Sequence, residues 1–284
     1  MDQYLRDKHF QQQHAGQCDL LIELSLTHLS YAVIDQLHHR LQILYYSNYS
    51  SNNDHKTNIL DQLDEHVETH QELKFPFRKT KVSIQSTLFT FIPTELFDHA
   101  LVKDYAKFVH PTISKNQSIL INDISSVGIK NLTVLEDNLQ TGLMNHFDQA
   151  LILNQASPFL TGVNHLVIEN EKTSLAINIR SKIVEFALFH SGKLKFYNLF
   201  DCIHADELNY FILHLIKELD LNPTQTQVLL AGHIKRNDPH YERIKKYFSN
   251  IQFLSVWPLL AQSDLAEQLL PHEFFSLISL NLCE

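Results

Sequence analysis

Two histidines four residues apart, His66 and His70, are the first residues of this chain whose spacing could do chemistry. On a helix this spacing places both imidazoles on one face, where they could hold a metal ion beside the carboxylates of Glu65 and Glu68. No third ligand is evident, and a chain with 18 histidines produces such pairs by chance. We therefore interpret the pair as part of a solvated helix face with Val67 on its buried flank, and we expect no metal site.

Cys202, His204 and Asp206 form a second candidate, a thiol nucleophile with its base. Residues two apart in an extended segment point to the same side, as such a pair requires. No glycine-rich elbow or oxyanion donor accompanies them, and Asp206 is explained as a first-turn acid of a helix that begins there. The sequence therefore predicts no catalytic residue.

A basic cluster is formed by Lys235–Arg236, Arg243 and Lys245–Lys246. A solvated helix face is the commoner meaning of such spacing, and an anion site is the alternative. Because the cluster follows Gly232 closely, the alternative stays open.

Composition excludes several classes of function. The 284 residues include 44% hydrophobic and 19% charged side chains, which suits a folded chain with two domains of ordinary size. A net charge of -9 without a dense Lys/Arg block argues against nucleic acid as the partner. The three separated cysteines favour a reducing compartment. No apolar run reaches the roughly 18 residues that would span a bilayer, so a cytoplasmic protein without membrane insertion is expected.

The chain contains one pattern twice. Residues 20–70 can be laid on residues 173–223 without a gap, each residue meeting the one 153 positions later. In both copies apolar residues alternate through three short segments and then recur at helical spacing, which predicts three strands followed by a helix. The second helix is expected at 206–219, and the turn at 190–193 places Gly192 where positive φ is tolerated.

Further elements are expected between and after the two copies. Strands are predicted at 81–85, 87–93, 117–123, 130–136, 227–234 and 251–256, and helices at 94–109, 138–147 and 238–248. The helix at 94–109 would bury Leu96, Phe97, Ala100, Leu101, Tyr105 and Phe108. Residues 1–17 are Gln-rich and predict a frayed start, and residues 47–56 read as a Ser/Asn-rich connector. The two lobes would be 1–161 and 162–284.

This order of elements resembles the actin-like superfamily, which includes the sugar kinases and the seventy-kilodalton chaperones. The resemblance covers nearly the whole chain. It implies an α/β, duplicated actin-like ATPase (ribonuclease H-like) fold of two lobes, each with a mixed sheet that starts as a three-strand meander followed by helices. More narrowly, a bacterial family of this fold with no assigned activity is similar in Asp206 with Tyr210, the Leu219–Pro223 turn, the Val228–Gly232 strand and the closing Leu282–Glu284.

Active members of the superfamily hold ATP between the lobes, on one Asp-x-Gly hairpin in each lobe and beside a Gly-Gly turn near the adenosine. Glycine lets the backbone approach phosphates, and the acid positions magnesium-bound water. Here the first hairpin offers Glu23 and Ser25 at those positions, and the second offers Ala176 and Asn178. Near the adenosine a single Gly232 is left, so the resemblance predicts that ATP hydrolysis has been lost.

We therefore expect a non-enzymatic, degenerate actin-like protein that binds another protein, as cytoplasmic actin-like components of pilus and secretion assemblies do. A divergent ATPase or kinase of the same superfamily is the alternative. No cofactor is expected, and Gly232 is the one position where a nucleotide could bind weakly. The resemblance places a partner site around the interlobe cleft, and an acidic or amphipathic peptide is its expected ligand. The residues named for it are Glu23, Thr27, His28, His233, Lys235 and Arg236.

Overall fold

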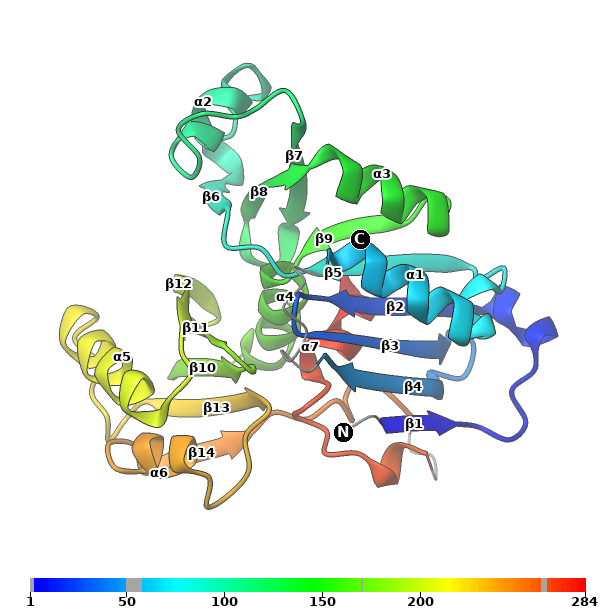
Figure 1. The fold of residues 1–284 in the computed structure, drawn as a ribbon. Helices are drawn as coiled ribbons and strands as arrows, with labels where there is room; N and C mark the ends of the chain where they lie inside the picture. Colours follow the sequence, from blue (N-terminus) through cyan, green and yellow to red (C-terminus); the bar gives the residue numbers. More distant parts are fainter. Residues whose placement is uncertain (1–2, 50–57, 170, 262–264) are drawn as a thin grey trace. The chain divides into compact units, whose positions relative to one another are not determined.

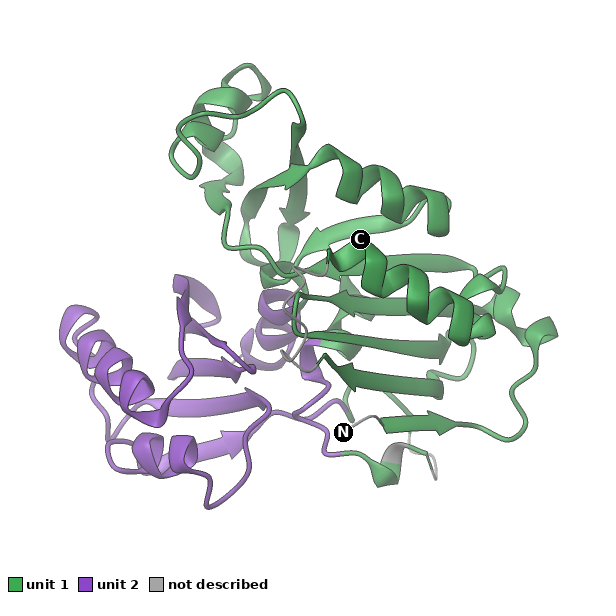
Figure 2. Ribbon diagram, viewed as in Figure 1, with its two compact units in different colours: residues 1–158, 257–269, 277–284 green, residues 159–256, 270–276 purple. Residues whose placement is uncertain are grey.

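The chain forms two compact units, shown in a computed structural model that describes residues 3–49, 58–169, 171–261 and 265–284 (Figure 1). Unit 1 comprises residues 1–158, 257–269 and 277–284, and unit 2 comprises residues 159–256 and 270–276 (Figure 2). The lobes expected from the sequence, 1–161 and 162–284, remain a prediction about the domains, because a division by compactness does not test it.

Unit 1 is built on a six-stranded mixed sheet in the order β1-β4-β3-β2-β5-β9. Its strands are β1 (Gln3–Arg6), β2 (Cys18–Leu24), β3 (His28–Asp35), β4 (Arg40–Asn48), β5 (Lys79–Ile84) and β9 (Leu151–Asn154). The first hairpins are antiparallel, whereas β5 pairs with β2, and β9 with β5, in parallel. Every residue of β2 is buried, because the strand lies inside the sheet with both faces covered.

Unit 2 repeats five of these strands in the same order and with the same directions. Its sheet runs β12-β11-β10-β13-β14. The strands are β10 (Thr173–Ile179), β11 (Ile183–His190), β12 (Lys193–Asp201), β13 (Gln227–Gly232) and β14 (Asn250–Phe253). The predicted duplication of a three-strand meander is therefore confirmed, and β1 is the one strand of the larger sheet without a counterpart.

The gap-free match of the two copies is wrong for the first two strands. Glu23 pairs with Ser30 and Asn178 with Glu185, each one pair before the end of the hairpin, so these strands match with an offset of 155 residues. The turn that follows spans residues 36–39 in the first copy and only 191–192 in the second. Because that turn is two residues shorter, the offset falls to 153 on the third strand.

The third strands also share an irregularity. The register shifts between Val33 and Ile34 where β3 meets β4, and between Leu188 and Phe189 where β11 meets β12. The extra residue of each bulge lies on the third strand. It is Gln42 in β4 and Lys195 in β12, and these two residues are 153 positions apart.

One helix covers each meander. These helices are α1 (Ile59–Thr69) and α5 (Ala205–Glu218), and their last residues are 149 positions apart. The sequence match at 153 therefore misplaced the helix by four residues, about one helical turn. Leu63 and Val67 of α1 and Leu208, Ile212 and Leu215 of α5 pack into the cores of their own units.

The connection from the fourth to the fifth strand distinguishes the units. In unit 2 the described part of this connection contains α6 (Pro239–Lys245). Unit 1 instead inserts a second, antiparallel sheet in the order β6-β8-β7. The inserted elements are β6 (Phe89–Pro93), α2 (Val102–Lys107), β7 (Gln117–Ile124), β8 (Ile129–Glu136) and α3 (Asp137–His146). The remaining helices are α4 (Ala156–Val167) and α7 (Phe275–Ser279).

Two expectations for unit 1 were wrong. The helix predicted at 94–109 is broken into short turns and α2, and Leu96 and Phe108 are 67% and 84% exposed instead of buried. The predicted frayed start contains β1, which pairs with β4, and a 3₁₀ helix at Gln12–Gln17. Most of the connector predicted at 47–56 lies outside the described residues.

Candidate functional sites

The turn between β2 and β3 is the first candidate site. The hydroxyl oxygen of Ser25 accepts hydrogen bonds from the N–H groups of Thr27 (3.1 Å) and His28 (2.9 Å) and lies 2.7 Å from the His28 ring Nδ1. The Ser25 N–H donates to the carbonyl of His28 at 3.0 Å. Three amides of this turn therefore already have acceptors inside it, and a serine side chain supplies the acceptor that organises them.

Glu23 lies on β2 two residues before this turn. It is 6% exposed, and its cross-strand partner Ser30 donates to its Oε2 at 3.4 Å. His28 is also buried, whereas Thr27 is half-buried with its hydroxyl 3.2 Å from that of Ser25. The predicted first-lobe residues thus belong to one turn and its preceding strand, and two of the three are buried.

Gly232 ends β13 and is the second candidate site. Its φ of 81° is in the left-handed region, and a Cβ there would meet the Ile179 carbonyl oxygen at 2.1 Å, so only glycine fits. Its N–H donates to the carbonyl of His272 at 2.8 Å. The next two amides donate as well, His233 to Ile179 at 2.7 Å and Ile234 to Gly232 at 2.9 Å. The glycine is therefore explained by close backbone packing.

Asn178, on the neighbouring β10, lies in a buried polar cluster. Its Nδ2 donates to Glu185 Oε2 at 2.6 Å and to Ser276 Oγ at 3.3 Å. The Tyr197 hydroxyl donates to the other oxygen of Glu185 at 2.5 Å, and Arg180 lies 3.8 Å from this carboxylate. Asn178 thus has an evident structural role in fixing two strands and the segment at 270–276.

The structure changes which residues of the two hairpins correspond. Asn178 occupies the position of Glu23, and Arg180 that of Ser25, because Ser25 donates to His28 as Arg180 donates to Ile183. The sequence match had assigned Ala176 and Asn178 to these positions. Neither hairpin has glycine at the corresponding place.

The basic cluster of unit 2 is partly neutralised. Lys235 Nζ lies 3.8 Å from Glu273, whose pKa is raised by burial, and Arg236 lies 5.7 Å from the centre of the Phe253 ring. On α6, Arg243 pairs with Asp206 at 2.7 Å. Lys235 nevertheless keeps a side chain that is 64% exposed, so charge is available at this surface.

The buried imidazole of His272 underlies this surface. Its Nε2 donates to the carbonyl of Ile234 at 2.7 Å, and burial lowers its pKa below the ordinary histidine value. The neutral form is therefore favoured, and it holds the 270–276 segment against the Gly232 turn.

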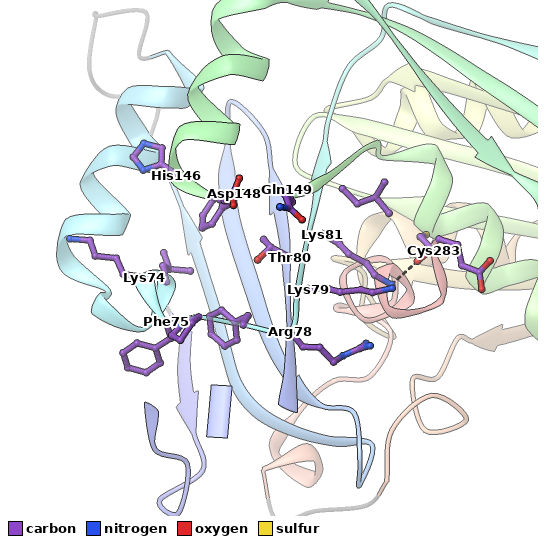
Figure 3. A pocket seen from close by; sticks show the side chains of 16 residues that line it. Lys74, Phe75, Arg78, Lys79, Thr80, Lys81, His146, Asp148, Gln149 and Cys283 are labelled. Atoms are coloured by element: carbon purple, nitrogen blue, oxygen red, sulfur yellow. Dashed lines mark hydrogen bonds between the residues drawn. The ribbon is translucent and has the colours of Figure 1, made fainter. Parts of the chain in front are cut away.

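Unit 1 contains a second basic cluster that sequence reasoning missed. Lys74, Arg78, Lys79 and Lys81 line a pocket of about 720 Å³ together with Phe75, Pro76, Phe77, His146, Phe147, Asp148, Gln149 and others (Figure 3). The signal was available as the basic and aromatic run at 74–81. It sits at the start of β5, where the parallel partner β9 does not begin until the residue opposite Lys81.

Two of these four cations have structural partners. Arg78 donates twice to the buried carboxylate of Asp19, at 2.8 and 2.6 Å. Lys81 is buried and donates to the carbonyls of Asn281 (3.0 Å) and Cys283 (2.6 Å), and burial lowers its pKa. Figure 3 shows Lys81 and Lys79 extending toward Cys283. Lys79 and Lys74 have no ion pair with a described residue.

The two reactive patterns of the sequence are accounted for by structure. Burial raises the pKa of the Cys202 thiol to about 11, which disfavours the nucleophilic thiolate, and Asp206 pairs with Arg243. The interpretation of His66 and His70 as part of a solvated helix face is wrong, because both rings are half-buried and pack on Tyr45, with ring centres 5.5 and 4.2 Å from it. Among the described residues, no three His, Cys, Asp or Glu side chains gather in a way that could hold a metal ion. No helix in the described ranges is both long and apolar enough to cross a membrane.

Comparison with known proteins agrees with this architecture. Residues 7–251 match the family described as "Protein of unknown function (DUF3822)". This chain belongs to the DUF3822 family. No curated protein matches the sequence.

Solved structures show the fold of this DUF3822 protein. A Bacteroides thetaiotaomicron protein with actin-like ATPase fold and unknown function is 17% identical, with a TM-score of 0.81 over 97% of this chain and 99% of that one. A chain of the PilM-PilN type IV pilus biogenesis complex is 11% identical, with a TM-score of 0.66 over 93% and 97%. The ethanolamine utilization protein EutJ from Carboxydothermus hydrogenoformans is 8% identical, with a TM-score of 0.50 over 94% and 89%. The chain therefore has the actin-like ATPase fold, as the resemblance implied.

Proposed function

We propose that this DUF3822 protein is a non-enzymatic actin-like protein that acts by binding another protein. The observation that carries the proposal is the use of the backbone amides at the Gly232 turn. Gly232, His233 and Ile234 donate to acceptors inside unit 2, so this turn offers none of these three N–H groups to a phosphate or an adenosine.

The β2–β3 turn supports the same proposal. Ser25, Thr27 and His28 donate their amides within the turn, and the acid at Glu23 is buried beside Ser30. A phosphate-binding hairpin needs amides that point to the ligand and an acid that can reach magnesium. The β2–β3 hairpin instead uses these groups for its own internal hydrogen bonds.

PilM supplies the comparison for a binding role. It is a protein of the same fold that has been solved in complex with PilN. Since the identity is 11%, the comparison suggests a kind of activity and neither a partner nor a pathway.

An ATP hydrolysis assay and a calorimetric titration with nucleotide test whether the protein turns over or binds ATP. We expect purified protein with magnesium and ATP to show no hydrolysis above background and at most weak heat of binding. Hydrolysis that disappears in Glu23→Gln, while that variant unfolds at the same urea concentration as wild type, would overturn the proposal. Glutamine is the matched choice because Glu23 is buried and alanine would leave a cavity.

The surface at Lys235 and Arg236 is the proposed contact for an acidic or amphipathic segment of the partner, because both are exposed and Lys235 carries accessible charge. The double reversal Lys235→Glu with Arg236→Glu should lose proteins that co-purify with wild type. Lys103→Glu with Lys107→Glu makes a charge change of the same size on exposed positions of α2, outside the basic cluster, and serves as the control. Equal co-purification by both double variants would place the contact elsewhere.

A further inference from the structure

The edge of the unit 2 sheet differs from the corresponding edge of unit 1. In unit 1 the third meander strand, β4, is covered by β1, which pairs with it in antiparallel direction from Gln3 opposite Tyr46 to Arg6 opposite Ile43. In unit 2 the third strand, β12, is the last strand of its sheet (Figure 1). The duplication therefore supplies an internal example of what can be added to this edge.

The backbone groups that would receive an added strand can be identified from the turn. His190 and Lys193 flank the two-residue turn and form the hydrogen-bonded pair that closes such a hairpin. Hydrogen-bonded and non-hydrogen-bonded pairs alternate along an antiparallel ladder, and the bulge adds one residue to β12. Leu199 and Glu185 therefore form a non-hydrogen-bonded pair, and the backbone N–H and C=O of Leu199 point away from β11. In keeping with this, the Leu199 N–H has no partner in β11 and donates to the side-chain oxygen of its neighbour Asn198 at 2.8 Å, a local hydrogen bond that an added strand would replace.

The same direction holds in unit 1, where the edge is occupied. The bulge residue Gln42 turns its carbonyl outward and accepts the Asp7 N–H at 2.8 Å, and Leu44 and Tyr46 lie opposite Leu5 and Gln3 of β1. Gln42, Leu44 and Tyr46 of β4 correspond, with the offset of 153, to Lys195, Tyr197 and Leu199 of β12. The outer edge of β12 therefore presents the same pattern of donors and acceptors.

Aromatic side chains lie beside both edges, although Asn198 occupies in β12 the position of Tyr45 in β4. Tyr4 of β1 packs on the α1 side against Tyr45, 6.2 Å between ring centres, and His70, 5.8 Å. Beside β12 a row of aromatic rings extends from Phe200 of the strand across α5 to His214. Its ring centres are 4.4 Å apart from Phe200 to Phe211, 5.5 Å from Phe211 to Tyr210 and 6.1 Å from Tyr210 to His214. Tyr210 is 64% exposed, so this surface could receive one more ring.

The lysines of β12 indicate that the added segment should carry an acidic residue. Asp7 follows β1 and lies at Gln42, the residue that Lys195 replaces in unit 2. An acid at the place of Asp7 would therefore face Lys195. The exposed Lys193 lies two residues before Lys195, at the start of β12. Opposite charges at facing positions stabilise strand pairs.

Lysines and bulges also occur where natural sheets protect an edge from pairing, which is the plain alternative. The bulge itself does not prevent pairing, because β4 carries the same bulge and accepts β1. Both lysines lie at one end of β12, and residues 196–200 carry no charge. A strand without an acid would be rejected, and a strand with one at the matching place would be accepted.

We propose that the outer edge of β12 binds a short extended segment of a partner protein, which pairs antiparallel with residues 195–199. The segment would carry an aromatic side chain on the α5 face and an acidic residue opposite Lys195. This inference rests on the proposed protein-binding function and names the strand that would perform it. Main-chain hydrogen bonds would supply affinity, and the aromatic and acidic side chains would supply selectivity.

A peptide with the sequence of the chain's own β1 segment, Gln3 to His9, is the probe, because it carries both features at the required spacing. Labelled with a fluorophore, it would be titrated by anisotropy against the full-length protein. Leu199→Pro removes an outward N–H and spares the β11 ladder, and Leu199→Ala is its matched control. We expect Leu199→Pro to weaken binding about tenfold or more relative to Leu199→Ala, both variants keeping the wild-type urea midpoint.

A charge exchange makes the register of the pairing testable. Lys195→Glu should weaken binding of the peptide, and a peptide with Asp7→Lys should recover it on that variant alone. A peptide with Tyr4→Ser should bind wild type more weakly, because it lacks the ring expected on the α5 face.

Three results would overturn the proposal: no saturable binding to wild type up to about 1 mM peptide, equal binding by folded Leu199→Pro and Leu199→Ala, or no recovery in the charge exchange. Sedimentation of wild type and Leu199→Pro adds a fourth, because a dimer that only the proline variant dissociates would assign the edge to a second copy of this chain. Magnesium-dependent ATP hydrolysis would overturn the proposed function and would leave these peptide results standing.

Discussion

Asn178 and Glu185 face each other across the first hairpin of unit 2, joined by a hydrogen bond of 2.6 Å. The same two positions in unit 1 hold Glu23 and Ser30, joined at 3.4 Å. Each copy thus buries one carboxylate with one neutral partner, but the acid has changed strands between the copies. This exchange keeps a hydrogen bond in both cores and avoids a pair of like charges.

Restoring an acid at the second hairpin should therefore be harmful. Asn178→Asp would place two carboxylates in contact, and we expect the free energy of unfolding at pH 7 to fall by about 2–4 kcal/mol. Asn178→Ser removes the amide without adding charge and is the control. Urea unfolding of both variants at pH 7 checks this, and equal losses of stability in the two variants would contradict it.

Gly232 should be intolerant of a side chain. Gly232→Ala would place a Cβ 2.1 Å from the Ile179 carbonyl oxygen at a positive φ, and we expect a loss of roughly 2–4 kcal/mol in the free energy of unfolding. Gly128→Ala is matched in φ, at 70°, but has no atom within 4 Å of the added Cβ, so it should lose only about 1 kcal/mol. Similar urea midpoints for the two variants would show that close packing at Gly232 is unimportant.

Lys81 should anchor the last residues of the chain. Lys81→Met is one atom shorter and unbranched like lysine, but it leaves the carbonyls of Asn281 and Cys283 without their donor, and we expect a loss of about 2–3 kcal/mol in the free energy of unfolding. Limited proteolysis should then cut residues 277–284 earlier than in wild type. Lys79→Met, on the same strand and exposed, should change neither measurement. Equal protection of the end in both variants would rule out the anchoring role.

Acid should weaken unit 1 through Glu72. Burial raises the pKa of this carboxyl, but hydroxyl donation from Tyr31 at 2.6 Å and Tyr4 at 2.9 Å opposes burial, and the pKa lies below its ordinary value of 4.5. A carboxyl with a lowered folded pKa stabilises the fold above its unfolded pKa, and this contribution disappears as the pH falls through the folded pKa.

The urea midpoint should therefore decline below about pH 4.5 more steeply in wild type than in Glu72→Gln, which has no proton to gain there. Glu207→Gln is the comparison in an exposed helix cap of unit 2, and its midpoint should follow wild type in the unit 1 transition. Parallel curves for wild type and Glu72→Gln would exclude this carboxyl as the source of acid sensitivity.

The repeated three-strand meander followed from the sequence because alternation of apolar residues survives small errors of alignment. A shift of two residues in a strand and of four in a helix both keep the apolar face, so the offset of 153 matched the hydrophobic pattern although it was wrong for two strands and the helix. The correct offset depends on the length of the 191–192 turn, which no apolar residue marks. The fold was thus predictable and the residue correspondence was not.

Several elements were missed or misplaced, and among them β9 and α4 were not predicted although both are apolar. The strand Gln3–Arg6 is mostly polar, and it is held by main-chain pairing to β4. Residues 96–108 have a helical apolar spacing, yet Phe108 is 84% exposed because no layer of the described structure covers it. At the candidate sites, the use of amides by Ser25 and by the Gly232 turn depends on backbone geometry, which residue type alone does not determine.

The route of the chain has a consequence for its synthesis. Unit 1 takes residues from three separate stretches, and the buried ammonium of Lys81 finds its acceptors 200 and 202 positions later. A ribosome adding 5–20 residues per second needs roughly 10–40 s to cover that distance. For the part of this interval that follows the synthesis of β9, all six strands of the sheet are present without the segment that holds Lys81. The buried ammonium of Lys81 therefore has neither of these acceptors in the nascent chain until residues 281–283 have been added.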